Sequence, residues 1–135
     1  MKRYGITLLI LAISSIILLS ATNQDKKTRI IPQEYKTMKN PVRPSELGLE
    51  DAKDLWNTQC KSCHGNSGLG DGIKAKNLGK PCGNLSTQDF QSQLTEGGIY
   101  YLTFIAKNED HKFDKKITDE TDRWNIVNFI RTLKK

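Results

Sequence analysis

The sequence has few of the residues from which most enzyme and metal sites are built. Its 135 residues include only three cysteines, two histidines and two methionines. No glycine-rich loop leads into the Gly-Lys-Ser/Thr of a phosphate-binding loop. Aromatic residues do not interleave with a basic stripe, as they do in nucleic-acid binders. We therefore expect neither nucleotide nor nucleic-acid binding, and the lack of a nucleophile–base pair predicts that the chain is not an enzyme.

A long apolar run is also missing, except near the N-terminus. Lys2 and Arg3 precede an apolar stretch at 6–19, and small residues ending at Ala21 follow it, a pattern typical of an export signal. The stretch is shorter than the roughly 20 residues of a membrane-spanning helix. Residues 1–21 are therefore predicted to be a signal peptide. The alternative is an uncleaved anchor that associates the exported, periplasmic protein with the membrane.

Two further segments follow the predicted signal. Residues 22–45 are polar and contain three prolines, which break regular elements. We interpret this segment as a flexible arm that either tethers the domain or lies against it through Ile30, Ile31 and Tyr35. Residues 46–135 are predicted to form the single domain. The whole chain carries a net charge of +6, and its lysine clusters suit an acidic partner.

One five-residue motif, Cys60-Lys61-Ser62-Cys63-His64, carries most of the chemistry. Side chains three residues apart share one face of a helical turn and lie roughly 5–6 Å apart. That separation suits two thioether bonds to the vinyl groups at one edge of a haem. The following histidine can then bind the iron. Cys-x-x-Cys-His is typical of covalent c-type haem attachment.

Three other interpretations of the motif are weaker. A redox dithiol usually opens a helix after a strand, and no such pattern surrounds Cys60. A zinc site needs a second ligand pair, whereas Cys82 and His111 are single and far apart in the sequence. A structural disulfide leaves His64 unexplained. Cys82 itself is expected to be a buried thiol, or to pair with another chain.

The remaining pattern predicts an all-α domain of about five helices around the haem. Ser45 is expected to cap a helix that runs into the motif, and Thr118 to cap the last helix, whose broad apolar face enters the core. A short helix is predicted over 73–78. Ser86 is expected to cap a helix over 87–94, and Gly97-Gly98 to separate it from another over 99–107.

With these residues in view, the stretch from Gly48 to Leu133 resembles the mono-haem c-type cytochromes of bacteria. The likeness rests on Cys60–Gly65, on Gly68-Leu69-Gly70-Asp71-Gly72, on Trp56 four residues before the first cysteine, and on the helix Arg123–Leu133. It implies that the carbonyl of Pro81 accepts a hydrogen bond from the ring of His64. It also implies crossed first and last helices, with Ala52 and Trp56 against Ile126, Phe129 and Ile130. Because Trp56 lies one turn before Cys60, we expect it to pack at the haem edge or against another helix.

The sequence departs from that family at the second axial position of the iron. The family's methionine is absent, and Asp110 aligns with it when Phe113 is matched. His111, one place later, is the only other histidine, and we predict His64/His111 ligation. Otherwise the iron is open, water-bound or reached by Met38.

The predicted function is electron transfer to redox partner proteins through one covalent haem c, as a periplasmic carrier or a respiratory-chain subunit. The alternative is binding or sensing of a small gas, which requires an open distal position.

Overall fold

The computed structural model describes residues 30–79, 81–106, 111 and 113–135. The predicted signal, the first residues of the predicted arm and Asp110 lie outside this part. Residues 31–135 form one compact unit, and every regular element described in it is a helix. The all-α class predicted from the sequence is therefore confirmed. No helix in the described ranges is long and apolar enough to cross a membrane.

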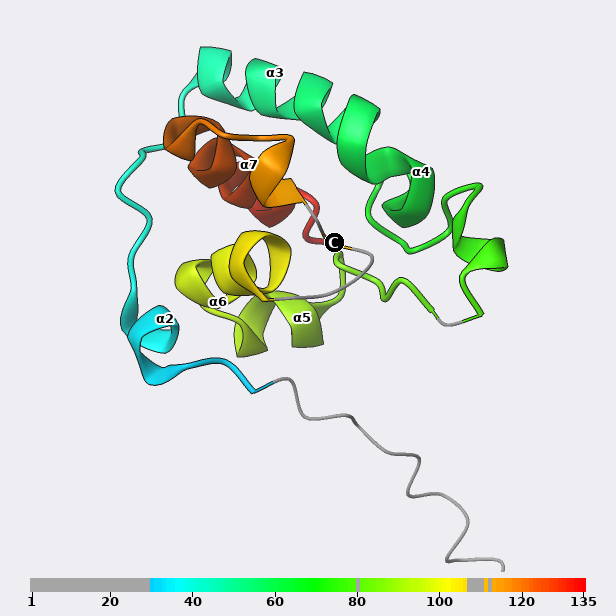
Figure 1. The fold of residues 1–135 in the computed structure, drawn as a ribbon, viewed down its shortest axis with the longest axis horizontal. Coiled ribbons are helices and arrows are strands. Elements are labelled where there is room, and N and C mark those ends of the chain that lie inside the picture. Colours follow the sequence, from blue (N-terminus) through cyan, green and yellow to red (C-terminus); the bar gives the residue numbers. More distant parts are fainter. Residues whose placement is uncertain (1–29, 80, 107–110, 112) are drawn as a thin grey trace, which may run out of the picture. The chain divides into compact units, whose positions relative to one another are not determined.

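The haem motif lies at the end of a long, nearly continuous helix (Figure 1). Its three segments are α3 (Glu46–Leu55), the π-helical turn η2 (Trp56–Cys60) and α4 (Lys61–His64). The hydroxyl of Ser45 accepts a hydrogen bond from the Gly48 N–H at 3.1 Å, so the predicted N-cap is confirmed. Helix α4 ends at Gly65, whose φ is 77°. Glycine suits this position because few other residues adopt a positive φ without strain. The site is thus carried by a helix with defined ends.

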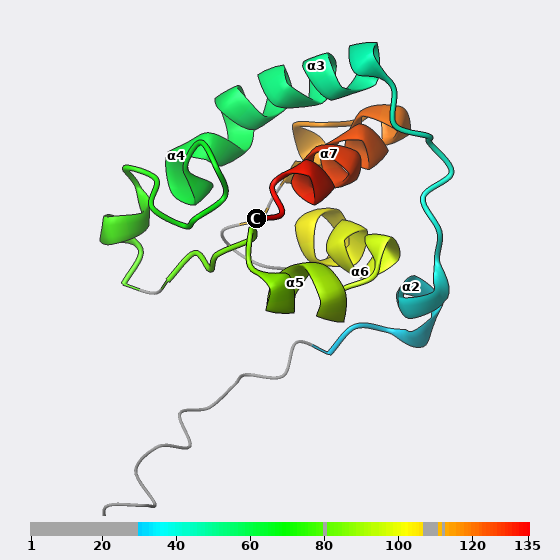
Figure 2. The same ribbon diagram turned by 180° about the vertical axis from the view of Figure 1, so that it is seen from behind.

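Helix α7 (Glu120–Thr132) packs along α3, as both ribbon views show (Figure 2). Ala52, Ile126 and Val127 meet in the core with no exposed surface. The rings of Trp56 and Phe129 lie 5.5 Å apart. Packing between the first and last long helices of the domain is therefore confirmed.

The other face of α7 is covered by shorter helices. These are α5 (Gln88–Gln93) and α6 (Glu96–Tyr100), the latter continued by the π-helical turn η4 (Tyr101–Ile105). Tyr100 stacks on Trp124 of α7 with ring centroids 4.3 Å apart. The helix predicted over 73–78 is reduced to the 3-10 turn η3 (Ala75–Asn77), and a second such turn, η5, covers Phe113–Lys115.

Two predicted N-caps are wrong by one residue. Thr87 caps α5, since its hydroxyl accepts from the Phe90 N–H at 3.2 Å. Ser86 is instead buried and donates its hydroxyl to Asn84. At α7 the cap is Asp119, which accepts from the Asp122 N–H at 3.0 Å. Neighbouring Ser, Thr and Asp residues are all good caps, and at α5 the short-range bond from Ser86 to Asn84 leaves Thr87 as the cap.

The Gly97-Gly98 pair was expected to separate two helices, but it lies in the first turn of the second one, α6. Thr95 caps that turn by accepting from the Gly98 N–H at 3.1 Å. A Cβ on Gly97 would lie 2.6 Å from the Cβ of Met38 and would overlap the Tyr35 carbonyl oxygen. Glycine is therefore needed for close packing of the N-terminal arm.

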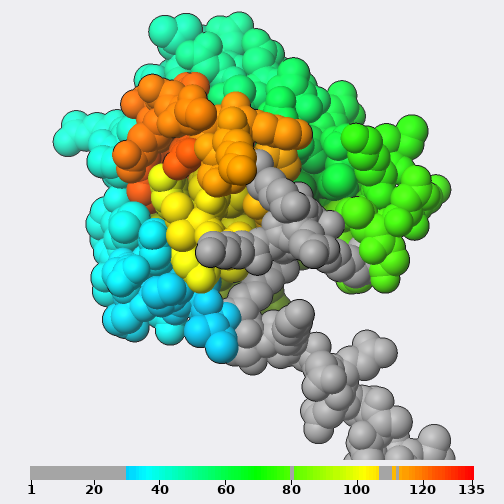
Figure 3. Space-filling model, viewed as in Figure 1, coloured from blue at the N-terminus to red at the C-terminus, as the bar shows by residue number. Residues whose placement is uncertain are grey.

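From residue 31 the arm lies against α6 and α7 (Figure 3). It includes a short helix, α2 (Gln33–Thr37), although prolines were expected to prevent one. Pro32 precedes the helix, where its missing N–H costs nothing. Of the three expected contacts, Ile31 is buried and Tyr35 packs on Tyr101 with centroids 4.8 Å apart, whereas the prediction for Ile30 is wrong because its side chain is 85% exposed. Asn40 donates to the Trp124 carbonyl at 3.2 Å and to the Asn128 side chain at 2.8 Å.

We expect Gly97→Ala to destabilise the folded protein by about 1–3 kcal/mol, because the added methyl group must displace backbone of the arm. Gly98→Ala is the matched control in the same helical turn. Its Cβ would meet only side chains, at 3.2 Å or more, and we expect a change within about 1 kcal/mol. Urea unfolding of both variants measures the difference. Equal losses would show that the arm does not require the glycine.

Candidate haem site

The site begins with the two cysteines of the motif, which lie on one helical turn. Cys60 ends η2 and is buried, while Cys63 and His64, both in α4, are half-buried. Neither Cys60 nor Cys63 is in a disulfide. Both sulfurs are therefore available for thioether formation.

The electrostatics of Cys60 do not suit a redox dithiol. Burial, and to a lesser degree the neighbouring Cys63, raises the pKa of the Cys60 thiol to about 12. Cysteines that exchange disulfides have a lowered pKa, because the thiolate is the reactive form. A zinc site is unsupported as well, since the described residues bring no three His, Cys, Asp or Glu side chains together.

Trp56 connects the motif to the core. Its indole Nε1 donates a buried hydrogen bond to the Gly65 carbonyl at 3.1 Å. The ring lies 5.9 Å from the His64 ring and 5.5 Å from the Phe129 ring. One side chain thus spans from α7 to the residue that directly follows His64. Sequence reasoning placed Trp56 near the haem but missed this acceptor, because a backbone carbonyl leaves no sequence signal.

The glycine loop, which is residues 65–72 with glycine at four of the eight positions, packs against the backbone of α4. A Cβ on Gly72 would lie 2.6 Å from the carbonyl carbon of Cys63. The N–H groups of Gly70 and Gly72 donate to the carbonyls of His64 and Cys63, at 3.0 and 3.1 Å. Carbonyls in the last turn of a helix lack partners within it. The loop therefore completes the end of α4 and holds the motif in place.

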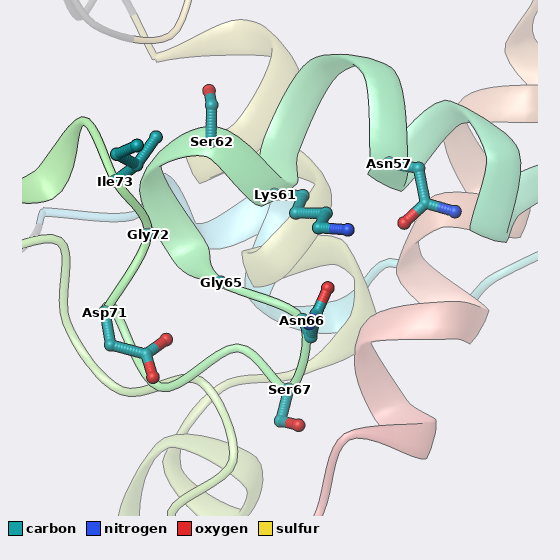
Figure 4. A pocket seen from close by; sticks show the side chains of 9 residues that line it. All are labelled: Asn57, Lys61, Ser62, Gly65, Asn66, Ser67, Asp71, Gly72 and Ile73. Carbon is teal, nitrogen blue, oxygen red and sulfur yellow. The ribbon is translucent and has the colours of Figure 1, made fainter.

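Beside this loop lies an open hollow of about 590 Å³ (Figure 4). It is lined by Asn57, Lys61, Ser62, Gly65, Asn66, Ser67, Asp71, Gly72 and Ile73. Most of the lining residues are polar, and neither cysteine nor His64 is among them. This hollow is consequently a surface feature next to the haem motif.

His111 lies beside His64, with ring centroids 5.9 Å apart and ring planes at 39°. Its Nδ1 is 3.3 Å from the Leu102 carbonyl oxygen. The structure therefore brings together the two histidines that the sequence analysis singled out. Met38, the other ligand considered, packs against Gly97 of α6.

The sequence also led to predictions about Pro81 and Cys82. Pro81 is exposed, and the hydrogen bond to its carbonyl from His64 stays a prediction. Cys82 was expected to be buried but is half-buried.

The donor set fits a covalently held haem. Two thiols lie on one turn, and an imidazole follows them directly. Two imidazoles that bind one metal from opposite sides, each about 2 Å from it, have centroids roughly 6 Å apart. The centroids of the two histidine rings are 5.9 Å apart, which is close to that spacing.

We expect Trp56→Phe to lower the free energy of unfolding by about 1–3 kcal/mol more than Trp124→Phe does, because only the first change leaves a buried carbonyl without its donor. Trp124 is a matched control: both rings are 2% exposed, and the Trp124 Nε1 has no hydrogen-bond partner among the described residues. Chemical unfolding of the haem-loaded proteins gives the comparison. Equal losses would mean that the Trp56–Gly65 bond contributes little.

Comparison with known proteins places the chain in a family. None of the curated proteins compared with it matches. Residues 49–134 match the family model described as Cytochrome c. The matched range covers more than half of the 135 residues and includes the motif, the glycine loop and α7. The chain therefore belongs to the cytochrome c family, whose members carry covalently bound haem c with its iron and use it for electron transfer.

Proposed function

We propose that this protein is a mono-haem electron carrier of the periplasm, working either alone or as a subunit of a respiratory complex. The observation that carries the proposal is that hydrogen bonds hold the end of the Cys60–His64 turn from two sides. Trp56 donates to the Gly65 carbonyl, and the glycine loop donates to the carbonyls of Cys63 and His64. A carrier needs its redox centre in the same environment in both oxidation states. The contacts around this turn provide that.

Each residue has a distinct proposed role. The thiols of Cys60 and Cys63 each add across one vinyl group, so S–H adds to C=C and nothing leaves. His64 binds the iron, the Pro81 carbonyl orients the His64 ring, and Trp56 packs beside that ring. The bound haem supplies reversible one-electron chemistry.

Other functions are less well supported. Cytochrome c domains are typically electron carriers, and we propose no enzymatic activity for this one. Sensing of a gas needs an open position at the iron, and the ring of His111 lies 5.9 Å from that of His64. Carbon monoxide distinguishes the two functions: a carrier with both positions filled binds it weakly, whereas a sensor binds it tightly.

We expect protein exported from cells with working cytochrome assembly to carry the full added mass of one haem, retained after denaturation, because no atoms leave in thioether formation. Cys60→Ala/Cys63→Ala should carry none. Cys82→Ser is the matched control and should keep the haem. Intact-protein mass spectrometry and haem staining of denaturing gels measure both. Haem retained by the double variant, or lost in Cys82→Ser, would contradict the proposed attachment.

A surface beside the motif is suited to partner contact. Ile73 is 84% exposed, and the exposed Lys74 and Lys76 follow it closely. The Lys74 N–H donates to the Ser62 carbonyl at 2.8 Å, so this segment is joined to α4. An apolar side chain next to lysines suits a partner with an acidic contact surface.

We expect Lys74→Glu/Lys76→Glu to slow oxidation of the reduced protein by the anionic probe ferricyanide by about threefold or more at low salt. Lys36→Glu/Lys39→Glu, on the arm, makes the same change in net charge and should have a smaller effect. The comparison of the two variants separates local from global charge, and stopped-flow rates across a salt series should show both effects shrinking, because salt screens exposed charges. Equal slowing in the two variants would argue against a local docking surface.

A further inference from the structure

The distal side of the site contains a histidine with a defined orientation. His111 is half-buried and lies between two aromatic neighbours. Its ring is 5.9 Å from that of His64 and 5.8 Å from that of Phe113. The ring of His111 therefore lies next to the residue that would bind the iron.

The contact with Leu102 determines which ring nitrogen of His111 can bind a metal. Nδ1 is 3.3 Å from the Leu102 carbonyl oxygen. A carbonyl only accepts, so this contact is a hydrogen bond when Nδ1 carries the proton. The lone pair of the neutral ring is then on Nε2. Metal-binding histidines commonly donate their other N–H to a carbonyl in this way.

The π-helical turn η4 accounts for the position of that carbonyl. Its closing hydrogen bond runs from the Ala106 N–H to the Tyr101 carbonyl at 2.7 Å, and Ala106 leaves the helix with an extended backbone. Leu102 is therefore in the last helical turn, where carbonyls have no partner within the helix. π-Helical turns frequently occur at functional sites.

We propose that His111 is the second axial ligand of the haem iron, bound through Nε2, and that the Leu102 carbonyl is the positioning group that fixes its tautomer. The inference rests on the proposed haem attachment. In the sequence alone, His111 lies one residue after the position of the family's methionine, and this offset left the second ligand undecided. The proposal assigns that ligand.

Met38 is the competing ligand, and its surroundings count against it. Its Cβ lies where the first turn of α6 requires a glycine, and the arm around it is held by the Tyr35–Tyr101 contact and by Asn40. Moving Met38 to the iron would break these contacts. His111 already lies next to His64.

The test compares three variants of the haem-loaded full chain. His111→Ala should convert the low-spin spectrum to a high-spin or water-bound one and raise the affinity for carbon monoxide by tenfold or more. Added imidazole should restore the low-spin spectrum. His111→Met should produce a methionine–iron charge-transfer band and a higher reduction potential, since methionine raises the potential. Met38→Leu is the control and should match the wild type in every respect.

The wild-type protein provides a test that does not depend on variants. Near-infrared magnetic circular dichroism should show the bis-histidine signature. A methionine band in the wild type, or an unchanged spectrum in His111→Ala, would overturn the inference. Absence of covalent haem in the wild type would instead overturn the proposed function, so the two failures are distinguishable.

The role of Leu102 is tested by nitrogen-15 labelling of histidine. The chain has two histidines, so the spectrum of reduced His111→Ala with unlabelled imidazole, which should restore the low-spin state, identifies by difference the His111 signals in the reduced wild type. We expect a slowly exchanging Nδ1–H for His111. Rapid exchange of that proton, with ligation intact, would overturn the positioning role while leaving the ligand assignment standing.

Discussion

The packing of α3 on α7 is the contact on which the rest of the structure depends. Ala52 and Ile126 have no exposed surface, so these helices approach closely, and Trp56 extends the same contact to the motif. A covalent cofactor with two attachment points tolerates little variation between its thiols and its ligand. Because the indole of Trp56 touches α7 and bonds the Gly65 carbonyl, the orientation of the motif follows from the core and not from the loop alone.

The sequence predicted the elements that local chemistry determines. Cys-x-x-Cys-His identified the cofactor, Ser45 marked the start of the first long helix, and the apolar face of the last helix placed it in the core. These features depend on spacing within a few residues, which a sequence displays directly. The glycine loop was also recognised, but its partner was not. Its N–H groups and small residues meet the backbone of α4, and a backbone has no residue type by which to be recognised.

Errors in prediction arose where a contact with another residue, near or distant in the chain, decides between equivalent local choices. Ser86 and Thr87 are both good caps, and only the bond between Ser86 and Asn84 removes the first from competition. Gly97 was interpreted as a break because glycine weakens helices. It is instead required by Met38 and Tyr35, about sixty residues earlier in the chain. The two π-helical turns were not predicted either, since an extra residue within a turn barely changes an apolar pattern.

His111 shows how a π-helical turn can orient a candidate ligand. An alignment on Phe113 leaves His111 one residue away from the family's methionine, so sequence spacing alone argues against equivalence. Backbone geometry removes the objection, because η4 presents the Leu102 carbonyl to Nδ1 and the ring lies beside His64. A pair of imidazoles holds iron at a lower potential than an imidazole and a thioether. If both histidines bind the iron, the protein accepts electrons less readily than a methionine-ligated relative does. Its donor must then be a stronger reductant, and a change at one axial residue would shift the place of the carrier in its electron-transfer chain without altering the helical framework.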